Sequence, residues 1–567
     1  MKYRPMNFAL TSCAFAALWG ICVAVTQVRA SQAYDDAPIG EPYKLEGNRL
    51  VFTNWIYVRP GDVGWFDAEG RSVYADTTRP LDHSAAQWRA QDHMPWGIHL
   101  QTYKPAEVRP YVVPVEFPWE EGGVITIATL VWDQDRYKAW GKCAAGDCYF
   151  ESTDGLKWER PKLGLVEFRG SRANNLIPSG PLGEVFVDPS SKDERFKCMF
   201  TLDQKVPYEK FQEYLKKRPD TWGRQALRQV DGQPRIVAVG GAVSADGFHW
   251  QQLPEPVSLE HSDNDCIGYY DPVTARYVAY LRRWNALKRA PGLGLPDEVR
   301  DTWFPGSRRG VSISETDDFR NFPLSKPAFE PGPELPPTDD IYLSCFTWIP
   351  RAPGIKLMFP SIWHRLNDTT TLALAVSPEG KTWHWAPEGR ELAETGPDGS
   401  WNGGYMFASP PLMELGNGDF ALRFSAYDVP HKYPRKFAHR VMGIATWPHG
   451  RIMAIAAPEK GEFATVALVT PGTKVYINAR TKRAGSIRVA VKTGMRRQGF
   501  TMEHNWGKIM GEMIPGHGFE DSIPIIGDHP RTLVRWKNAD DLGIKSGEPV
   551  VLLFKLEQAE VFALEFE

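Results

Sequence analysis

The sequence predicts an all-β protein, in which a five-bladed β-propeller is followed by a C-terminal β-sandwich. Three observations support this fold class. A turn motif, Ser-x-Asp-Gly-x-x-Trp, recurs along the middle of the chain, a pair of strands precedes each copy, and alternating strands continue after the repeat ends near residue 462. The chain has 567 residues, too many for one compact core, so we expect two or three domains.

Residues 1–30 are typical of an export signal. Lys2 and Arg4 precede the mostly apolar residues 8–25, and small residues up to Ala30 suit cleavage. We therefore expect a secreted or periplasmic protein, with an uncleaved membrane anchor as the alternative. No later apolar run is long enough to span a bilayer, so we expect no membrane contact once the signal is removed. Residues 31–108 are less regular and should pack on the propeller or lead into it.

The number of copies of the turn motif predicts the number of blades in the propeller, which we place at residues 109–460. Four clear copies and a degenerate fifth lie at 149–158, 241–250, 311–319, 374–383 and 441–450. In most copies an acidic side chain accepts backbone hydrogen bonds in the turn, Gly provides the positive φ, and Trp packs on the blade edge. The apolar strand, polar turn and aromatic strand ahead of each copy complete a four-stranded blade. Residues 206–232 and 285–306 are interpreted as surface insertions.

The C-terminal part, residues 461–567, is predicted to be the β-sandwich. Its expected strands include 473–479, 486–491, 549–556 and 561–566, in which apolar and polar residues alternate.

Composition narrows the classes of partner. The 21 Trp and the 12% aromatic content suit an all-β fold and suit binding of sugars by stacking on ring faces. The net charge is −3 and no basic stripe is present, so we expect no nucleic-acid partner.

Two cysteines are expected to form a disulfide. Cys143 and Cys148 flank the turn Ala-Ala-Gly-Asp and would face each other across a hairpin in an oxidising compartment, with free thiols as the alternative. Cys198, Cys266 and Cys345 lack the close spacing of metal ligands and are predicted to be buried apolar residues. The sequence therefore predicts no metal-binding cysteine set.

Acidic residues at the starts of the inner strands are the candidates for catalysis. Inner strands of a propeller converge on the central axis, so acids at the starts of these strands would lie close together there. The candidate catalytic residues are Glu116, Glu184, Asp263, Asp265 and Asp340. An ordinary turn role is the alternative for each of them.

Further polar and aromatic residues at strand ends are candidates for binding a sugar, with edge packing as the alternative. These candidates are His261, Arg282, Asp339, Trp363, His364, Trp401, Asn402, Tyr427 and His431. No cofactor is required by this set, and a structural calcium ion near His261 is the alternative.

The sequence resembles the five-bladed propeller glycoside hydrolases of families 32, 43 and 130. The resemblance is greatest to secreted family 32-like propeller proteins with a C-terminal β-sandwich. It rests on Trp119-Glu120, on the turn 152–158, on the run Arg-Pro-Lys-Leu-Gly-Leu-Val-Glu-Phe at 160–168 and on Asn174-Asn175. The family 32 nucleophile motif Trp-x-Asn-Asp-Pro-Asn-Gly is absent, and Val187-Asp188-Pro189 is interpreted as a turn.

The resemblance implies an exported enzyme that acts on glycosidic bonds of an oligo- or polysaccharide, with paired carboxylates at the propeller axis. A non-catalytic carbohydrate-binding surface protein is one alternative, and a polysaccharide lyase that uses Tyr, His and Arg side chains is another.

Overall fold

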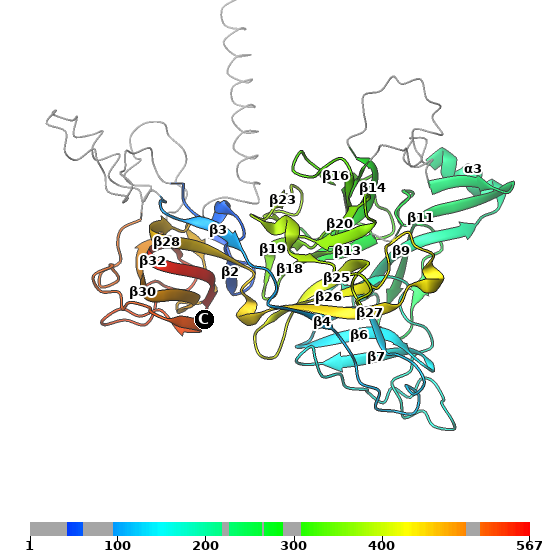
Figure 1. The fold of residues 1–567 in the computed structure, drawn as a ribbon, viewed down its shortest axis with the longest axis horizontal. Coiled ribbons are helices and arrows are strands. Elements are labelled where there is room, and N and C mark those ends of the chain that lie inside the picture. Colours follow the sequence, from blue (N-terminus) through cyan, green and yellow to red (C-terminus); the bar gives the residue numbers. More distant parts are fainter. Residues whose placement is uncertain (1–41, 61–94, 218–225, 264–265, 287–307, 495–510) are drawn as a thin grey trace, which may run out of the picture.

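The computed structural model describes residues 42–60, 95–217, 226–263, 266–286, 308–494 and 511–567 (Figure 1). Most of these residues form strands, and the α-helix α3 (Tyr208–Lys217) lies in the first predicted insertion. A β-propeller and a β-sandwich lie side by side in Figure 1, as the sequence predicts.

The first three blades are built from consecutive antiparallel strands. Blade 1 contains β5 (Thr126–Asp133), β6 (Arg136–Cys143) and β7 (Gly146–Ser152). Blade 2 contains β8 (Glu184–Val187), β9 (Phe196–Lys205), β11 (Gln233–Ser244) and β12 (Gln251–Gln252), with β10 (Leu227–Val230) paired to the other end of β11. Blade 3 contains β13 (Cys266–Asp271), β14 (Arg276–Ala286), β15 (Arg308–Thr316) and β16 (Lys326–Phe329).

Blade 4 consists of two sheets in line, because each of its first three strands is interrupted. One sheet has the order β17 (Asp339–Leu343), β20 (Ser361–His364), β21 (Thr369–Leu372), β24 (Ala393–Glu394). The other has the order β18 (Phe346–Ile349), β19 (Ala352–Met358), β22 (Ala375–Ser377), β23 (His384–Trp385). In the inner strand the break falls at Cys345, whose φ is +44°.

Blade 5 takes its outer strand from the N-terminal side of the chain. Its strands β25 (Tyr405–Glu414), β26 (Phe420–Tyr427) and β27 (Arg440–Trp447) are followed in the sheet by β4 (Glu107–Pro110). Arg109 of β4 lies opposite Ile444 of β27. Since β4 directly precedes blade 1 in the sequence, this pairing ties the first blade to the last.

The inner strands follow one another around an axis. β5 contacts β8, β8 contacts β13, β18 contacts β25, and β25 contacts β5. Blades 3 and 4 meet where the rings of Tyr269 and Phe346 stack with centroids 4.4 Å apart. The five blades therefore form a ring around a common axis.

The repeated turns have the geometry that the motif predicts. Asp154 Oδ1 accepts hydrogen bonds from the backbone N–H of Leu156 (2.8 Å) and of Lys157 (2.7 Å), and Gly155 has a φ of +72°. Asp246 accepts the equivalent pair of bonds in blade 2. These acids stabilise the turn that follows the third strand of each of these blades.

The β-sandwich combines C-terminal strands with strands from the N-terminal segment. Its C-terminal strands are β28 (Met453–Ala464), β29 (Leu468–Val469), β30 (Val475–Thr493), β31 (Asp528–Leu533) and β32 (Pro549–Phe566). β1 (Tyr43–Lys44) pairs with β29, β2 (Arg49–Val51) with β32, and β3 (His99–Thr102) with β28. Register shifts in β28 and β30 bend these long strands, as β-bulges do.

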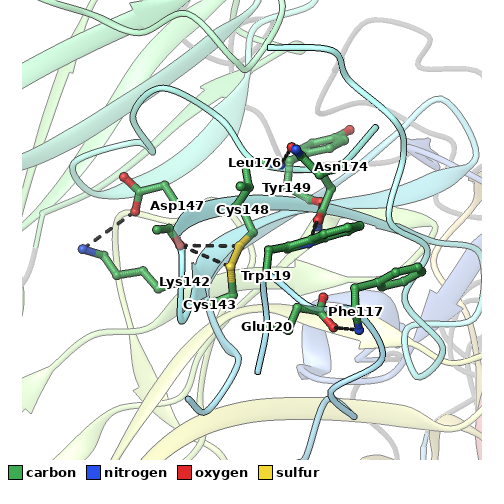
Figure 2. The surroundings of a disulfide bond; sticks show 12 residues. Phe117, Trp119, Glu120, Lys142, Cys143, Asp147, Cys148, Tyr149, Asn174 and Leu176 are labelled. Atoms are coloured by element: carbon green, nitrogen blue, oxygen red, sulfur yellow. Dashed lines mark hydrogen bonds and ion pairs between the residues drawn. A yellow bond between two sulfur atoms is a disulfide. The ribbon is translucent and has the colours of Figure 1, made fainter. Parts of the chain in front are cut away.

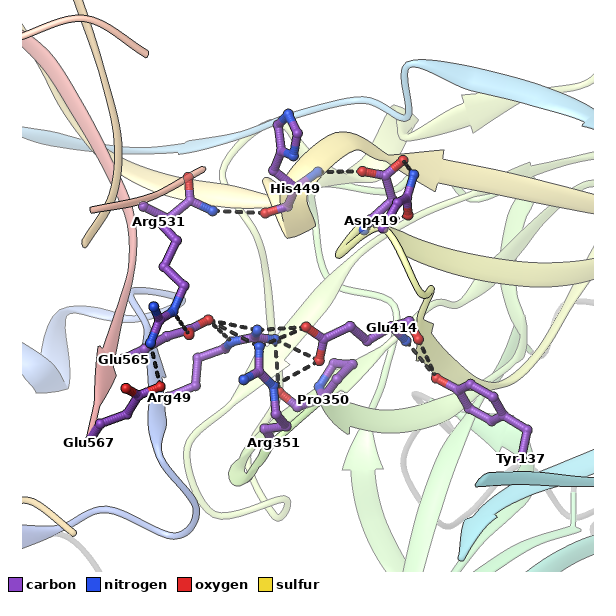
Figure 3. Close-up of polar contacts among 12 residues, drawn as sticks. Arg49, Tyr137, Pro350, Arg351, Glu414, Asp419, His449, Arg531, Glu565 and Glu567 are labelled. Carbon is purple, nitrogen blue, oxygen red and sulfur yellow. Dashed lines mark hydrogen bonds and ion pairs between the residues drawn. The ribbon is translucent and has the colours of Figure 1, made fainter. Parts of the chain in front are cut away.

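Blades 4 and 5 share one hydrophobic core with the sandwich. Leu50 and Phe52 of the N-terminal segment belong to the same buried cluster as Ile349 and Leu357 of blade 4. Beside this core, Arg49 Nη2 lies 2.8 Å from both Glu414 of β25 and Glu565 of β32 (Figure 3). Nonpolar burial and buried ion pairs therefore join the two parts.

No helix in the described part of the chain has the length and apolar composition needed to cross a membrane.

Candidate functional site

A cavity of about 850 Å³ runs along the propeller axis and is lined by inner-strand residues of all five blades. One lining residue from each blade is Leu130, Glu184, Ile267, Thr347 and Leu412. The volume falls in the range typical of small-molecule sites. We call it the axial cavity.

The axial cavity is open where the inner strands end. Trp132, near the end of β5, lines it and is 51% exposed. Asp271, Trp348 and Glu414, at or near the ends of the inner strands of blades 3, 4 and 5, also line this mouth. The mouth therefore combines aromatic rings with charged groups, which is a combination suited to a polar ligand with flat apolar faces.

Glu184 is the predicted catalytic residue that lines the axial cavity. It begins β8, and the next residue, Val185, donates its backbone N–H to Thr129 Oγ1 of blade 1 at 2.9 Å. Burial raises the pKa of the Glu184 carboxyl, while the positive charge of Arg423 and a hydrogen bond with Thr129 partly oppose this rise. A carboxyl in this setting keeps its proton at a higher pH than an exposed one.

Arg423 is the buried cation near Glu184. Its Nη1 donates to the carbonyl of Ile127 (3.1 Å) and its Nη2 to the carbonyl of Pro410 (2.9 Å), so it joins the inner strands of blades 1 and 5. Its Nε has no hydrogen-bond partner within the described residues. Sequence reasoning missed this residue, although a lone Arg within the apolar strand 420–424 was a signal.

Asp340 lies in a second polar cluster, at the opposite end of the inner strands. It is fully buried in β17, whereas the cavity lining of blade 4 comes from β18 and β19. Its carboxylate lies 2.8 Å from Arg309 Nη1 and 2.8 Å from Arg365 Nη2. Two guanidinium groups thus hold this carboxylate.

Asp263 is also ion-paired. Its Oδ1 lies 2.8 Å from Arg282 Nη1, and the same guanidinium donates from Nη2 to the carbonyl of Tyr342 at 2.9 Å. The Arg282 guanidinium carbon is 4.2 Å from the centre of the Tyr342 ring. Arg282 therefore holds Asp263 and Tyr342 together.

Tyr342 is the aromatic centre of this second cluster. Its hydroxyl lies 2.8 Å from His431 Nε2, and the rings of Trp363 and Phe407 lie 5.6 and 5.5 Å away. Tyr342, His431 and Arg282 are residue types that a polysaccharide lyase would use. They are only 5%, 7% and 3% exposed, and the lyase alternative stays a prediction.

The remaining binding candidates of blades 4 and 5 also have protein partners. His364 Nδ1 lies 2.9 Å from Asp339 Oδ2. Tyr427 stacks on Tyr405 with ring centroids 4.1 Å apart, and Trp401 stacks on Phe424 at 5.9 Å. Asn402 is buried, and its side-chain Nδ2 lies 3.9 Å from the sulfur of Met406.

His261, Glu116 and Asp265 complete the predicted set. His261 Nδ1 lies 2.9 Å from Arg228 Nη2, and burial together with Arg228 lowers the pKa of His261 to about 4. Glu116 pairs with Arg160 at 3.2 Å and is not part of the axial cavity lining. Asp265 lies outside the described residues.

Cys143 and Cys148 form a disulfide across the hairpin of β6 and β7 (Figure 2). Cys198, Cys266 and Cys345 are buried free cysteines. Within the described ranges, no three His, Cys, Asp or Glu residues are grouped as a metal site requires. A calcium ion stays a prediction.

The fold and the axial cavity define a β-propeller protein with a ligand-sized central site. No protein-family model and no curated protein matches the sequence. The chain is similar to solved propeller glycoside hydrolases. One is a thermostable family 43 glycoside hydrolase, at 11% identity, with a TM-score of 0.33 and with 62% of this chain and 96% of that one covered.

Two further similar structures are a sucrose-6-phosphate hydrolase and an arabinofuranosidase. The first, from Lactobacillus gasseri, is 8% identical, with a TM-score of 0.32 and with 82% of this chain and 93% of that one covered. The second, the family 62 α-L-arabinofuranosidase catalytic domain of Coprinopsis cinerea, is 10% identical, with a TM-score of 0.32 and coverages of 61% and 97%.

Proposed function

We propose that the protein is an exported glycoside hydrolase that cleaves its substrate in the axial cavity, with Glu184 as the general acid. The observation that carries this proposal is the position of Glu184. Its carboxyl lines a ligand-sized cavity, and burial raises its pKa. A protonated carboxyl near neutral pH is what donation to a leaving-group oxygen requires.

The proposed reaction begins when Glu184 protonates the glycosidic oxygen. The positive charge of Arg423 then stabilises the carboxylate that remains, because its attraction already opposes the rise in the pKa of Glu184. Arg423 is thus a positioning and charge-stabilising residue rather than a proton donor.

Asp265, which directly precedes β13 in the sequence and lies outside the described residues, stays the predicted second carboxyl group of the pair. Asp340 and Asp263 are held by arginines, and Glu116 is not part of the cavity lining. Of the predicted candidates only Asp265 is left for this role. A carboxylate near the axis would act as nucleophile or would activate water.

The test is a screen of the purified protein against a panel of oligo- and polysaccharides, together with Glu184→Gln and the control Glu167→Gln. Glu167 is exposed in the segment between blades 1 and 2. We expect Glu184→Gln to lower kcat by about 10²- to 10⁴-fold, because an amide cannot donate the proton. Full activity of Glu184→Gln on a substrate that the wild type cleaves would rule out Glu184 as the acid.

A non-catalytic carbohydrate-binding protein is the second candidate. The ion pairs of Asp340 and Asp263 favour it, because these acids then serve packing rather than chemistry. This candidate predicts saturable binding of a glycan, measured by calorimetry, with no release of reducing ends during prolonged incubation.

A further inference from the structure

The turn between β1 and β2 of the sandwich reaches the propeller beside the axial cavity. Asn48 donates its backbone N–H to the carbonyl of Arg351 in blade 4 at 3.2 Å. Gly47 has a φ of +92°, and a Cβ at this position would lie only 2.0 Å from the same carbonyl oxygen. The approach is therefore so close that the turn requires glycine here.

Glu46, the residue before this glycine, lines the axial cavity together with residues of the propeller. Its Oε2 would lie 3.2 Å from a Cβ on Gly354, so the Glu46 side chain reaches β19 of blade 4. The other described residues that line the cavity belong to the propeller blades or to their turns, whereas Glu46 comes from the sandwich.

Two charged groups of the propeller lie beside Glu46. Lys356 of β19 forms an ion pair with Asp271 of β13 at 3.0 Å, and both line the same cavity. Burial raises the pKa of Glu46, Lys356 lowers it and Asp271 raises it, so both charges act on this carboxyl. The three side chains bring one donor group and two carboxyl groups to the mouth.

An aromatic ring completes this part of the mouth. Trp348 of β18 lines the cavity and is partly exposed. Its ring lies 6.1 Å from that of Tyr269 and 6.0 Å from that of Phe346, which hold it in place. A held, partly exposed indole can stack on the face of a sugar ring.

We propose that Glu46, the Asp271–Lys356 pair and Trp348 form a sugar-binding subsite at the mouth of the axial cavity, so that the sandwich supplies a specificity-determining residue. Lys356 would donate to one hydroxyl of the sugar, and the two carboxyl groups would accept from its neighbours. The subsite holds two carboxyl groups, those of Glu46 and Asp271, and one ammonium group, that of Lys356. This balance of charge disfavours a carboxylate on the ligand, so the subsite takes a neutral sugar rather than a uronate. The assignment of this subsite to a substrate rests on the proposed function.

The experiment compares the full-length wild type with Glu46→Ala, Glu46→Gln and the control Glu512→Ala. Glu512 is an exposed acid of the sandwich. The probes are tetra- to hexasaccharides of fructose, arabinose, xylose, mannose and galactose, with oligogalacturonates of the same lengths as the charged comparison. Calorimetry gives Kd, reducing-end release gives kcat and KM, and thermal unfolding shows that each variant is folded.

We expect at least one neutral probe to bind the wild type more tightly than the oligogalacturonates do. Glu46→Ala should bind that probe at least tenfold more weakly, with kcat within about twofold of the wild type, since loss of a uniform binding contact raises KM alone. Glu46→Gln should lose less, because its amide oxygen still accepts a hydrogen bond. Glu512→Ala should match the wild type.

The outcomes separate this subsite from the proposed function. If the wild type cleaves a probe and a folded Glu46→Ala has an unchanged KM, the subsite is wrong and the hydrolase proposal stands. If the wild type binds a neutral probe without cleaving it and Glu46→Ala weakens binding, the subsite stands and the hydrolase proposal fails. Tighter binding of oligogalacturonates than of every neutral probe would overturn the neutral-sugar assignment.

Discussion

At the residue scale, acids at similar places in the sequence have different surroundings. Glu184 is the first residue of the inner strand β8, and Asp340 is the second residue of the inner strand β17. Asp340 is nevertheless fully buried between two arginines, whereas Glu184 lines a cavity. The difference lies in which residues the neighbouring blades bring near. Arg309 lies on β15, the third strand of blade 3, and Arg365 directly follows β20, the second strand of blade 4, and together they decide the role of Asp340.

Asp340→Asn should act on stability. Loss of the carboxylate leaves two guanidinium groups of a buried cluster without their counter-ion, so we expect a destabilisation of about 3–5 kcal/mol. Urea denaturation of the purified variant measures it. A variant as stable as the wild type that has lost all glycan turnover would instead make Asp340 catalytic.

Glu184→Gln should change how stability depends on pH. Because burial raises the pKa of Glu184 in the folded protein, the native state keeps this proton at pH values where the unfolded chain has released it. The contribution of the neutral carboxyl is complete below about pH 4.3, the ordinary value for Glu, and is lost as pH rises through the folded-state pKa.

The unfolding free energy of the wild type, minus that of Glu184→Gln, should therefore fall as the pH rises above about pH 4.3, the ordinary pKa of Glu. Urea denaturation at several pH values gives this difference. A difference that stays constant over the range, or rises with pH, would contradict a raised pKa.

At the element scale, β4 decides whether the propeller ring is closed. It is separated from its partner β27 by more than three hundred residues, and it leads directly into blade 1. Its hydrogen bonds to β27 make it the outer strand of blade 5, and the chain then continues into blade 1, so the pairing ties the last blade to the first.

Arg109→Pro tests this closure. Proline removes one backbone N–H from β4 and fixes its φ, so we expect a loss of about 3 kcal/mol in stability relative to Arg109→Ala. Arg109 itself is exposed and pairs with Glu107, so the alanine control should stay close to the wild type. Equal stability of the proline and alanine variants would show that β4 contributes little to the ring.

At the scale of the whole molecule, the sandwich is part of the wall of the axial cavity. Glu414 and Arg351 line the mouth, and Arg49 and Glu565 bind them from the sandwich side (Figure 3). One buried hydrophobic cluster lies behind this network. The two parts should therefore unfold together rather than as separate domains.

Arg49→Ala tests the junction. Arg49 is 6% exposed and binds both Glu414 and Glu565, so its loss leaves two mostly buried carboxylates less satisfied and should cost about 2–3 kcal/mol. Arg531, which is 40% exposed and also binds Glu565, is the matched control, and Arg531→Ala should cost less than about 1 kcal/mol. Equal effects in thermal and urea unfolding would show that Arg49 is not a junction residue.

The sequence by itself determined the fold class, because its signals are local. The turn around Asp154 and the alternation of strands such as β26 repeat within each blade, and neither depends on distant residues. Its list of acids also contained Glu184, since a position before an inner strand is a local property.

Only the tertiary structure decided which acid faces the cavity, where β4 pairs and what Glu46 contacts. Arg423 bonds to the carbonyl of Ile127, 296 positions away, and Asn48 to that of Arg351. Such contacts depend on strand register and on how blades and sandwich pack, and one residue of register moves a side chain to the other face of its sheet. The roles of Glu184 and Asp340 differ for this physical reason.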